Sequence, residues 1–94
     1  MGNQASKTDI VLSAEQVRAA RALMGWSRKD LATVSGLSQG TIKAIERGRT
    51  DYRLSTLRKL TRTFQAHGVS FLRENGWSGI VIKTAALDQL TRVV

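Results

Sequence analysis

Two short segments with apolar residues at helical spacing constrain the fold more than any other feature of this sequence. They span residues 28–34 and 39–46. Ser27 precedes the first segment and Ser38 precedes the second. Serine is a preferred helix N-cap because its hydroxyl accepts a hydrogen bond from an otherwise unpaired backbone N–H. We therefore predict two short helices in immediate succession.

The turn between these two helices is tight. Gly36 suits the left-handed backbone that such a turn often needs, and Ala32 is small enough to let two helices cross closely. The apolar side chains that we expect in one shared core are Leu31, Ala32, Leu37, Ile42 and Ile45. This is the helix-turn-helix pattern, in which the N-terminal end of the second helix can enter the major groove of DNA.

Two further helices flank this pair. We expect the first over residues 13–24, because Ser13 and Gln16 have the spacing of a capping box. We expect the second over residues 56–67, with Ser55 as its N-cap. Its apolar residues recur at i, i+3 and i+7, which is the spacing of one buried helix face: Leu57, Leu60 and Phe64.

The apolar pattern changes after the fourth helix. Residues 69–73 and 80–83 resemble strands, and residues 74–79 have turn chemistry, so the two strands could form a hairpin. An isolated hairpin is only marginally stable, so this one must pack on the helices or on a second subunit. The chain thus divides into a flexible N-terminal tail (1–9), a helix-turn-helix domain (10–68, motif at 27–46), a strand-like extension (69–83) and a C-terminal tail (84–94).

The charge of the chain points to a polyanion as partner. Fifteen Lys and Arg residues face seven Asp and Glu residues, a formal net charge of +8. A small basic domain of this kind usually meets nucleic acid. Seven of the basic residues fall close together in the sequence: Lys43, Arg47, Arg49, Arg53, Arg58, Lys59 and Arg62.

Composition argues against several other classes of protein. The sequence has no cysteine, which excludes disulfides and thiolate metal sites and fits a cytoplasmic location. Its one histidine, His67, has no evident partner for triad chemistry, and the acidic residues are scattered. No apolar run is long enough to cross a membrane. We expect no enzyme, no metal site, no cofactor and no membrane partner.

The residues in and around the two short helices are specific enough to suggest a family. The strings at 24–32, 35–38 and 41–48, the last ending in Ile-Glu-Arg-Gly, together resemble the Cro/C1-type helix-turn-helix family, also called the XRE family, of bacterial regulators. The resemblance covers roughly residues 13–72. It implies a mainly α fold, a compact four- to five-helix bundle, here with a C-terminal β-hairpin where a fifth helix would stand.

The same resemblance implies a DNA-binding transcription regulator with its recognition helix at 39–46. Its partner would be the major groove of double-stranded DNA, and a homodimer would place two recognition helices about one helical turn of DNA apart. An internal ion pair would join Arg21 and Glu46. The implied DNA contacts are Arg28, Ser38, Gln39, Thr41, Lys43, Arg47 and Arg49.

The recognition helix departs from the family pattern at two positions. Gly40 and Ala44 stand where base-contacting side chains often occur in the family. Gln39 suits a bidentate contact to adenine, whereas Ala44 offers at most a methyl contact to thymine. We expect Thr41 and Lys43 to lie beside Gln39 on the outer face, which leaves a sparse recognition surface.

This sparse surface keeps a second function open. A helix-turn-helix scaffold can lose its operator and retain its fold, because a fold does not determine a function. The chain would then act by protein–protein binding, as an antiactivator of another transcription regulator or as an antitoxin, and both activities could coexist. The residues that would contact such a protein partner are Trp77, Leu87, Leu90 and Val94.

Overall fold

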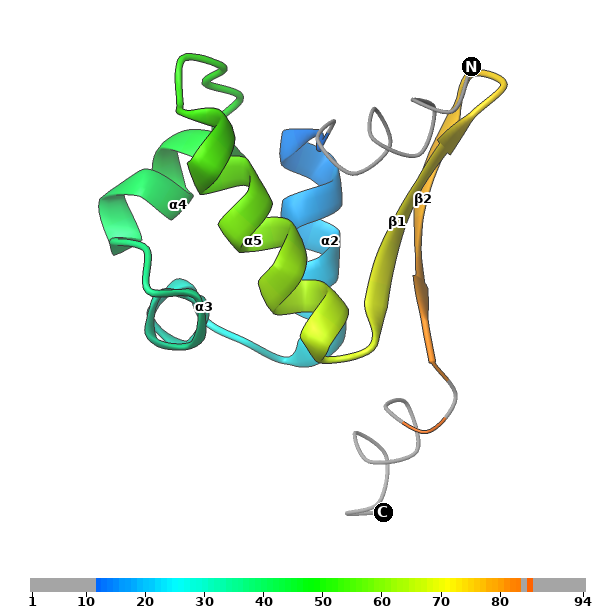
Figure 1. The fold of residues 1–94 in the computed structure, drawn as a ribbon, viewed down its shortest axis with the longest axis horizontal. Coiled ribbons are helices and arrows are strands. Elements are labelled where there is room, and N and C mark those ends of the chain that lie inside the picture. The colour runs from blue at the N-terminus through cyan, green and yellow to red at the C-terminus, as the bar shows by residue number, and fades with distance from the viewer. Residues whose placement is uncertain (1–11, 84, 86–94) are drawn as a thin grey trace.

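A computed structural model describes residues 12–83 and residue 85 of the chain. Within these residues, four helices precede one two-stranded antiparallel sheet (Figure 1). The mainly α fold with a C-terminal hairpin is therefore confirmed. In chain order the elements are α2 (Ala14–Met24), α3 (Arg28–Ser35), α4 (Gln39–Glu46), α5 (Leu54–Ala66), β1 (Val69–Glu74) and β2 (Trp77–Ile82).

Local capping determines where the first helices begin and end. Ser13 and Gln16 form the expected capping box at the start of α2, and Ser27 forms one with Asp30 at the start of α3. Gly25 ends α2 with φ +70°, in the left-handed region that favours glycine because glycine has no Cβ. These boundaries could be predicted because each depends on hydrogen bonds among close neighbours in the sequence.

The predicted start of the fourth helix was wrong. Its N-cap is Arg53, whose side chain makes no capping hydrogen bond, and Ser55 lies inside the first turn. The Arg53 carbonyl accepts the N–H groups of Thr56 and Leu57 at 3.0 and 3.2 Å. Tyr52, immediately before this point, is partly buried against the core.

The hairpin turn is shorter than expected. Only Asn75 and Gly76 form it, with φ of +53° and +79°. Two consecutive positive φ values define the type I′ turn, whose twist matches that of the flanking strands. The residues at 74 and 77–79, which we expected in the turn, belong to the strands instead, and Trp77 pairs with Glu74 across the hairpin.

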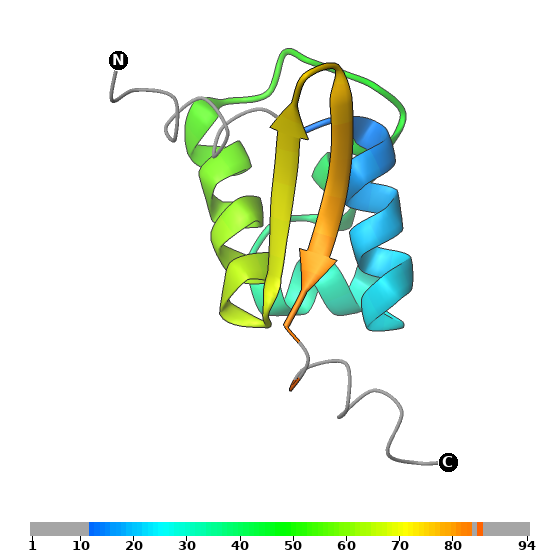
Figure 2. The same cartoon turned by 90° about the vertical axis from the view of Figure 1, so that its right-hand side faces the viewer.

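The hairpin covers the side of the bundle formed by α2 and α5. Figure 2 shows both strands in front of these two helices, with β1 in contact with α5 and β2 in contact with α2. The buried Gln16 of α2 fastens the sheet, because its Nε2 donates to the carbonyl oxygens of Leu72 and Gly79, both at 3.0 Å. The strand-like extension is thus part of the folded body.

One apolar core joins the helices to the hairpin. Phe64 of α5 lies near its centre, with its ring 5.7 Å from that of Trp26 and 5.5 Å from that of Phe71, measured between centroids. Helix α4 lies on the side of the bundle opposite the hairpin (Figure 1). The buried members of the core are Leu12, Val17, Ala20, Leu31, Ile42, Ile45, Leu57, Leu60, Phe64, Val69 and Phe71.

Candidate DNA interface

The turn between α3 and α4 is held by short-range hydrogen bonds. Gly36 has φ +78°, and its N–H donates to the Ala32 carbonyl at 2.9 Å. The buried Ser35 accepts the Leu37 N–H on its Oγ at 3.2 Å. Because the turn is bonded to α3 on both sides of Gly36, the direction in which α4 leaves it is fixed.

Ser38 and Thr41 close the N-terminal end of α4. The Ser38 hydroxyl accepts the Thr41 N–H at 3.1 Å and donates to Thr41 Oγ1 at 2.9 Å. Thr41 is partly buried. The helical turn therefore places Thr41 on the flank of α4, between the exposed side of the helix and the core.

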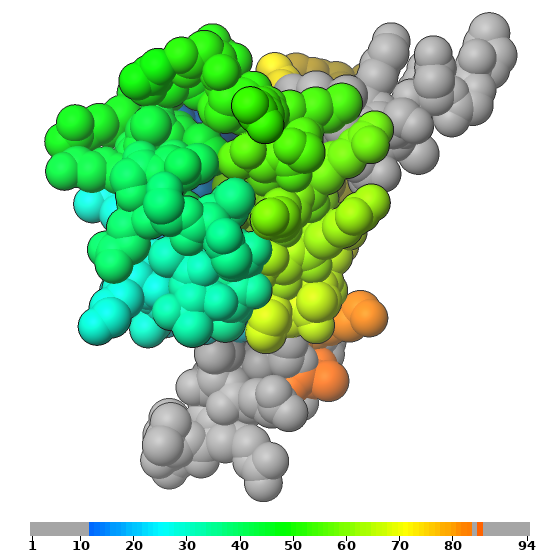
Figure 3. Space-filling view, turned by 60° about the vertical axis from the view of Figure 1, so that its left-hand side comes forward, coloured from blue at the N-terminus to red at the C-terminus, as the bar shows by residue number. Residues whose placement is uncertain are grey.

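The exposed side of α4 is a single row of polar residues. Gln39, Lys43 and Arg47 recur every four residues and are all exposed, so they lie on the same face of the helix. Gly40 adjoins this row and is also exposed, whereas Ala44 is partly buried. The surfaces of α3, α4 and α5 meet on one face of the molecule (Figure 3).

Glu46 ties three helices together behind this row. Only 1% of its side chain is exposed. Arg21 of α2 donates to both carboxylate oxygens, from Nε to Oε2 at 2.8 Å and from a terminal nitrogen to Oε1 at 3.1 Å. Arg28 of α3 adds a third bond, from Nε to Oε1 at 3.0 Å. The Arg18 guanidinium also donates to the Glu46 carbonyl.

These arginines keep the Glu46 carboxylate ionised inside the protein. Burial would raise the pKa of this carboxyl, but the hydrogen bonds and charges of Arg21 and Arg28 outweigh it and hold the pKa below its usual value. Arg28 is therefore partly committed to a structural contact, although 41% of its side chain stays exposed. Only its terminal nitrogens remain for a contact to DNA.

The loop after α4 contains an ion pair that no sequence pattern indicated. Arg49 Nε donates to Asp51 Oδ1 at 3.0 Å, and a terminal nitrogen of Arg49 contacts Oδ2. The hydrogen bond from Arg49 lowers the pKa of the Asp51 carboxyl. Because Asp51 offsets its charge, Arg49 is a weaker candidate for phosphate binding than Arg47.

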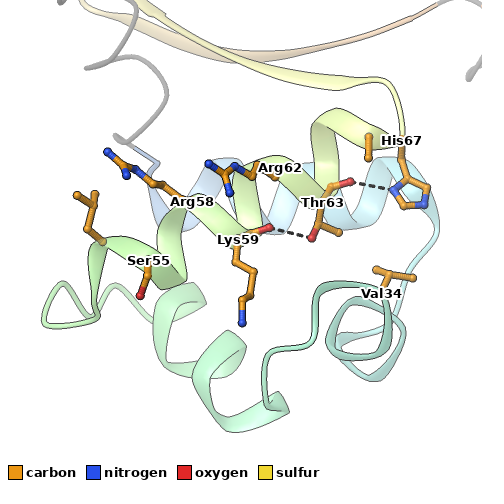
Figure 4. A pocket seen from close by; sticks show the side chains of 9 residues that line it. Val34, Ser55, Arg58, Lys59, Arg62, Thr63 and His67 are labelled. Atoms are coloured by element: carbon orange, nitrogen blue, oxygen red, sulfur yellow. Dashed lines mark hydrogen bonds between the residues drawn. The ribbon is translucent and has the colours of Figure 1, made fainter.

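Further cations line a shallow groove beside this face. Arg58, Lys59 and Arg62 project from α5, and Val34 of α3 lies across from them (Figure 4). The groove has a volume of about 760 Å³, and no acidic residue lines it. This part of α5 therefore extends the positive field around α4, which favours the approach of a polyanion.

Of the residues expected to contact a protein partner, the structure describes Trp77, which lies on the hairpin and away from α4. Trp77 is 79% exposed on β2, at the tip of the hairpin. Leu87, Leu90 and Val94 lie outside the described residues. Within the described part, no three His, Cys, Asp or Glu side chains gather as a metal site requires, and no helix is long and apolar enough to cross a membrane.

Comparison with known proteins agrees with this geometry. A family model described as helix-turn-helix matches residues 17–68, which is more than half of the chain. The match begins within α2 and ends directly after α5, so it leaves out the hairpin. No curated protein matches the chain with significant similarity.

Proposed function

Because the chain belongs to the Cro/C1-type helix-turn-helix family, also called the XRE family, we propose that it is a transcription regulator whose α4 enters the major groove of DNA. Membership of the family indicates DNA binding as the general activity. The particular residues, and the sequence that they recognise, are our proposal. A regulator of this kind acts in the bacterial cytoplasm, where the DNA is.

The observation that supports this proposal most strongly is the exposed row on α4. Gln39, Lys43 and Arg47 share one face, while the opposite face of α4 is buried through Ile42 and Ile45. A helix fixed in this way can present side chains to base edges without reorganising. Gln39 lies at the N-terminal end, which is the end that contacts bases in helix-turn-helix proteins.

Each candidate residue takes a role that follows from its chemistry. Gln39 is suited to pair with an adenine, and Lys43 is suited to donate hydrogen bonds to guanine or phosphate oxygens. Arg47, and more weakly Arg49, would bind phosphates. Arg28 would add a contact through its terminal nitrogens. Ser38 and Thr41 would position the start of α4.

Selection of binding sites from duplexes with a randomised centre tests this proposal. We expect enrichment of a short motif, and we expect Gln39→Ala to relax the preference at one position of that motif. Lys29→Ala provides a matched control, because Lys29 is an exposed cation on α3 outside the α4 row. Failure of the wild-type protein to enrich any motif would contradict sequence-specific binding.

An exposed tryptophan on the hairpin favours a second function, the binding of a protein partner. Trp77 is 79% exposed on the hairpin, and tryptophan is enriched where protein partners bind tightly. The chain would then bind another regulator, as an antiactivator, or a toxin, as an antitoxin, with Leu87, Leu90 and Val94 as further contacts. Affinity purification from the native host should recover one stoichiometric protein with the wild type but not with Trp77→Ala.

A further inference from the structure

The hairpin turns one of its faces to solvent, and that face is rich in large apolar side chains. On this outer face, the register places three pairs of residues directly opposite each other: Ser70 with Val81, Leu72 with Gly79, and Glu74 with Trp77. The inner face packs on the core through Val69 and Phe71. The exposed apolar residues of the outer face are Leu72 (43%), Trp77 (79%) and Val81 (46%).

Gly79 leaves a gap in the middle of this outer face. A methyl group at this position would meet no atom within 4 Å. The backbone does not require glycine, because Gly79 is not among the positive-φ residues. Leu72 projects directly beside the gap, so the face has a protruding side chain and an empty position next to each other.

We propose that the outer face of the hairpin binds the same face of a second copy of this chain. The two copies would be related by a half-turn about an axis that runs parallel to the strands, midway between β1 and β2. Each residue of one copy then faces, on the other copy, the position that pairs with it across the hairpin. Leu72 then fills the gap at the partner's Gly79, and Val81 covers the partner's Ser70. Isologous contact of this kind requires a self-complementary surface.

The third pair is complementary in chemistry. Under the same rotation Trp77 faces the partner's Glu74. The indole N–H is a donor that seeks a hydrogen-bond partner when it is buried, and an ionised carboxylate accepts such bonds. Glu74 is also the one ionisable residue among the six of this face. Self-association therefore covers the apolar side chains. It also provides a hydrogen-bond acceptor, the Glu74 carboxylate, for the indole N–H of Trp77, which is the one polar group that these side chains contain.

The size of the face limits the strength of the contact. Three rows of two residues lie at the small end of protein interfaces, and a net charge of +8 on each copy opposes association. We therefore expect a dissociation constant in the micromolar range. Association should be weaker at low salt, because the repulsion between the two positively charged copies is then less screened.

This pairing has a consequence for DNA binding, which rests on the proposed function. The hairpin and α4 lie on opposite sides of the bundle (Figure 1). Two copies joined through their hairpins would therefore direct their α4 helices away from each other. Such a dimer cannot place both helices in adjacent turns of one straight duplex, as family dimers do, and it would hold two separate duplexes instead.

Sedimentation equilibrium of the full chain without DNA, over a range of micromolar concentrations, tests the pairing independently of any DNA binding. We expect the weight-average mass to rise from monomer toward dimer. Gly79→Val should weaken association at least tenfold, because valine fills the gap that Leu72 needs. The same substitution should preserve or raise the thermal stability of the monomer, since the site is open and valine favours strands.

Two further variants separate surface complementarity from a general effect on folding. The double variant Leu72→Ala with Gly79→Leu exchanges the protruding residue and the gap, so it should associate more tightly than Gly79→Val does. Ser78→Val alters the neighbouring position on the opposite face and should leave the mass unchanged.

A monomeric mass at every concentration would overturn the proposal. So would a Gly79→Val variant that associates as the wild type does. If removal of residues 84–94 converts a monomer into a dimer, the C-terminal segment of the same chain occupies this face, and the second copy is not its natural occupant.

Discussion

At the scale of single residues, the buried carboxylate of Glu46 decides which substitutions test folding and which test binding. Arg21 gives it two hydrogen bonds and Arg28 gives it one. Removing one partner of a buried ion pair is costly because the remaining charge stays out of water. A loss of DNA binding in a variant of this cluster therefore has to be separated from a loss of the folded state.

The two arginines should differ in their contribution to stability. We expect Arg21→Met to lower the free energy of unfolding by about 3–5 kcal/mol, because it leaves Glu46 buried with one remaining partner. Arg28→Met should cost less, since Arg28 makes one bond and is more exposed. Urea denaturation measures both values. An equal effect of the two substitutions would contradict the assigned roles.

The same carboxylate should make stability depend on acid. The folded pKa of Glu46 lies below its ordinary value, which is about 4.3 in an unfolded chain. Its contribution is therefore fully present above that unfolded pKa and is lost as the pH falls through the lower, folded pKa. The wild type should lose its stability advantage over Glu46→Gln progressively as the pH falls below about 5. Unfolding free energies measured at several pH values would show this loss, and a constant difference would contradict it.

Asp51 should act as a restraint on DNA affinity. Asp51→Asn removes the charge that faces Arg49, so Arg49 becomes available for a phosphate. We expect the affinity for DNA to rise. The slope of log affinity against log salt concentration should become steeper by about one, because one more phosphate is neutralised. Glu74→Gln is the matched control, because it removes the same charge at the hairpin tip. Fluorescence anisotropy measures the DNA affinity of both variants. An equal gain in affinity would show that the change in net charge alone is responsible.

At the scale of elements, α4 combines a well-packed inner face with a sparse outer one. Gly40 is exposed in the first turn of this helix, and a methyl group there would meet only Ser38 Oγ, at 3.9 Å. Glycine in a helix is less favourable than alanine by about 1 kcal/mol. The folded chain alone gives no steric reason for glycine at this position, which is understandable if the backbone approaches DNA closely.

Gly40→Ala should separate stability from function. We expect it to raise the free energy of unfolding by about 0.5–1 kcal/mol, because alanine favours the helix and nothing obstructs its methyl group. It should also weaken DNA binding by holding α4 away from the groove. Denaturation and DNA titration of the same preparation measure the two effects. Greater stability with unchanged affinity would show that position 40 does not approach DNA.

The elements also show what the sequence could and could not predict. The starts of α2, α3 and α4 follow from Ser13, Ser27 and Ser38, because a cap is formed by residues three positions apart. The start of α5 was missed because no side-chain cap marks it: the N-cap residue Arg53 makes no capping hydrogen bond. The bond from Gln16 to the hairpin and the bond from Arg28 to Glu46 join residues far apart in the chain, and no local pattern contains them.

At the scale of the whole molecule, two surfaces with different chemistry lie on opposite sides of one core. The side formed by α4 is polar and basic, whereas the outer face of the hairpin is apolar and nearly uncharged. Because the core separates them, substitutions on one surface should leave the other unaffected. Trp77→Ala and Gln39→Ala therefore form a pair that distinguishes protein binding from DNA binding.

The central claim is that the exposed row on α4 contacts DNA, and salt-titrated anisotropy on two duplexes tests it most directly. One duplex contains the selected motif and the other has random sequence. We expect Gln39→Ala to lose affinity for the motif only, and Arg47→Ala to weaken binding to both duplexes while lowering the salt slope by about one. Equal affinity of the wild type for both duplexes, unchanged in both variants, would contradict the claim.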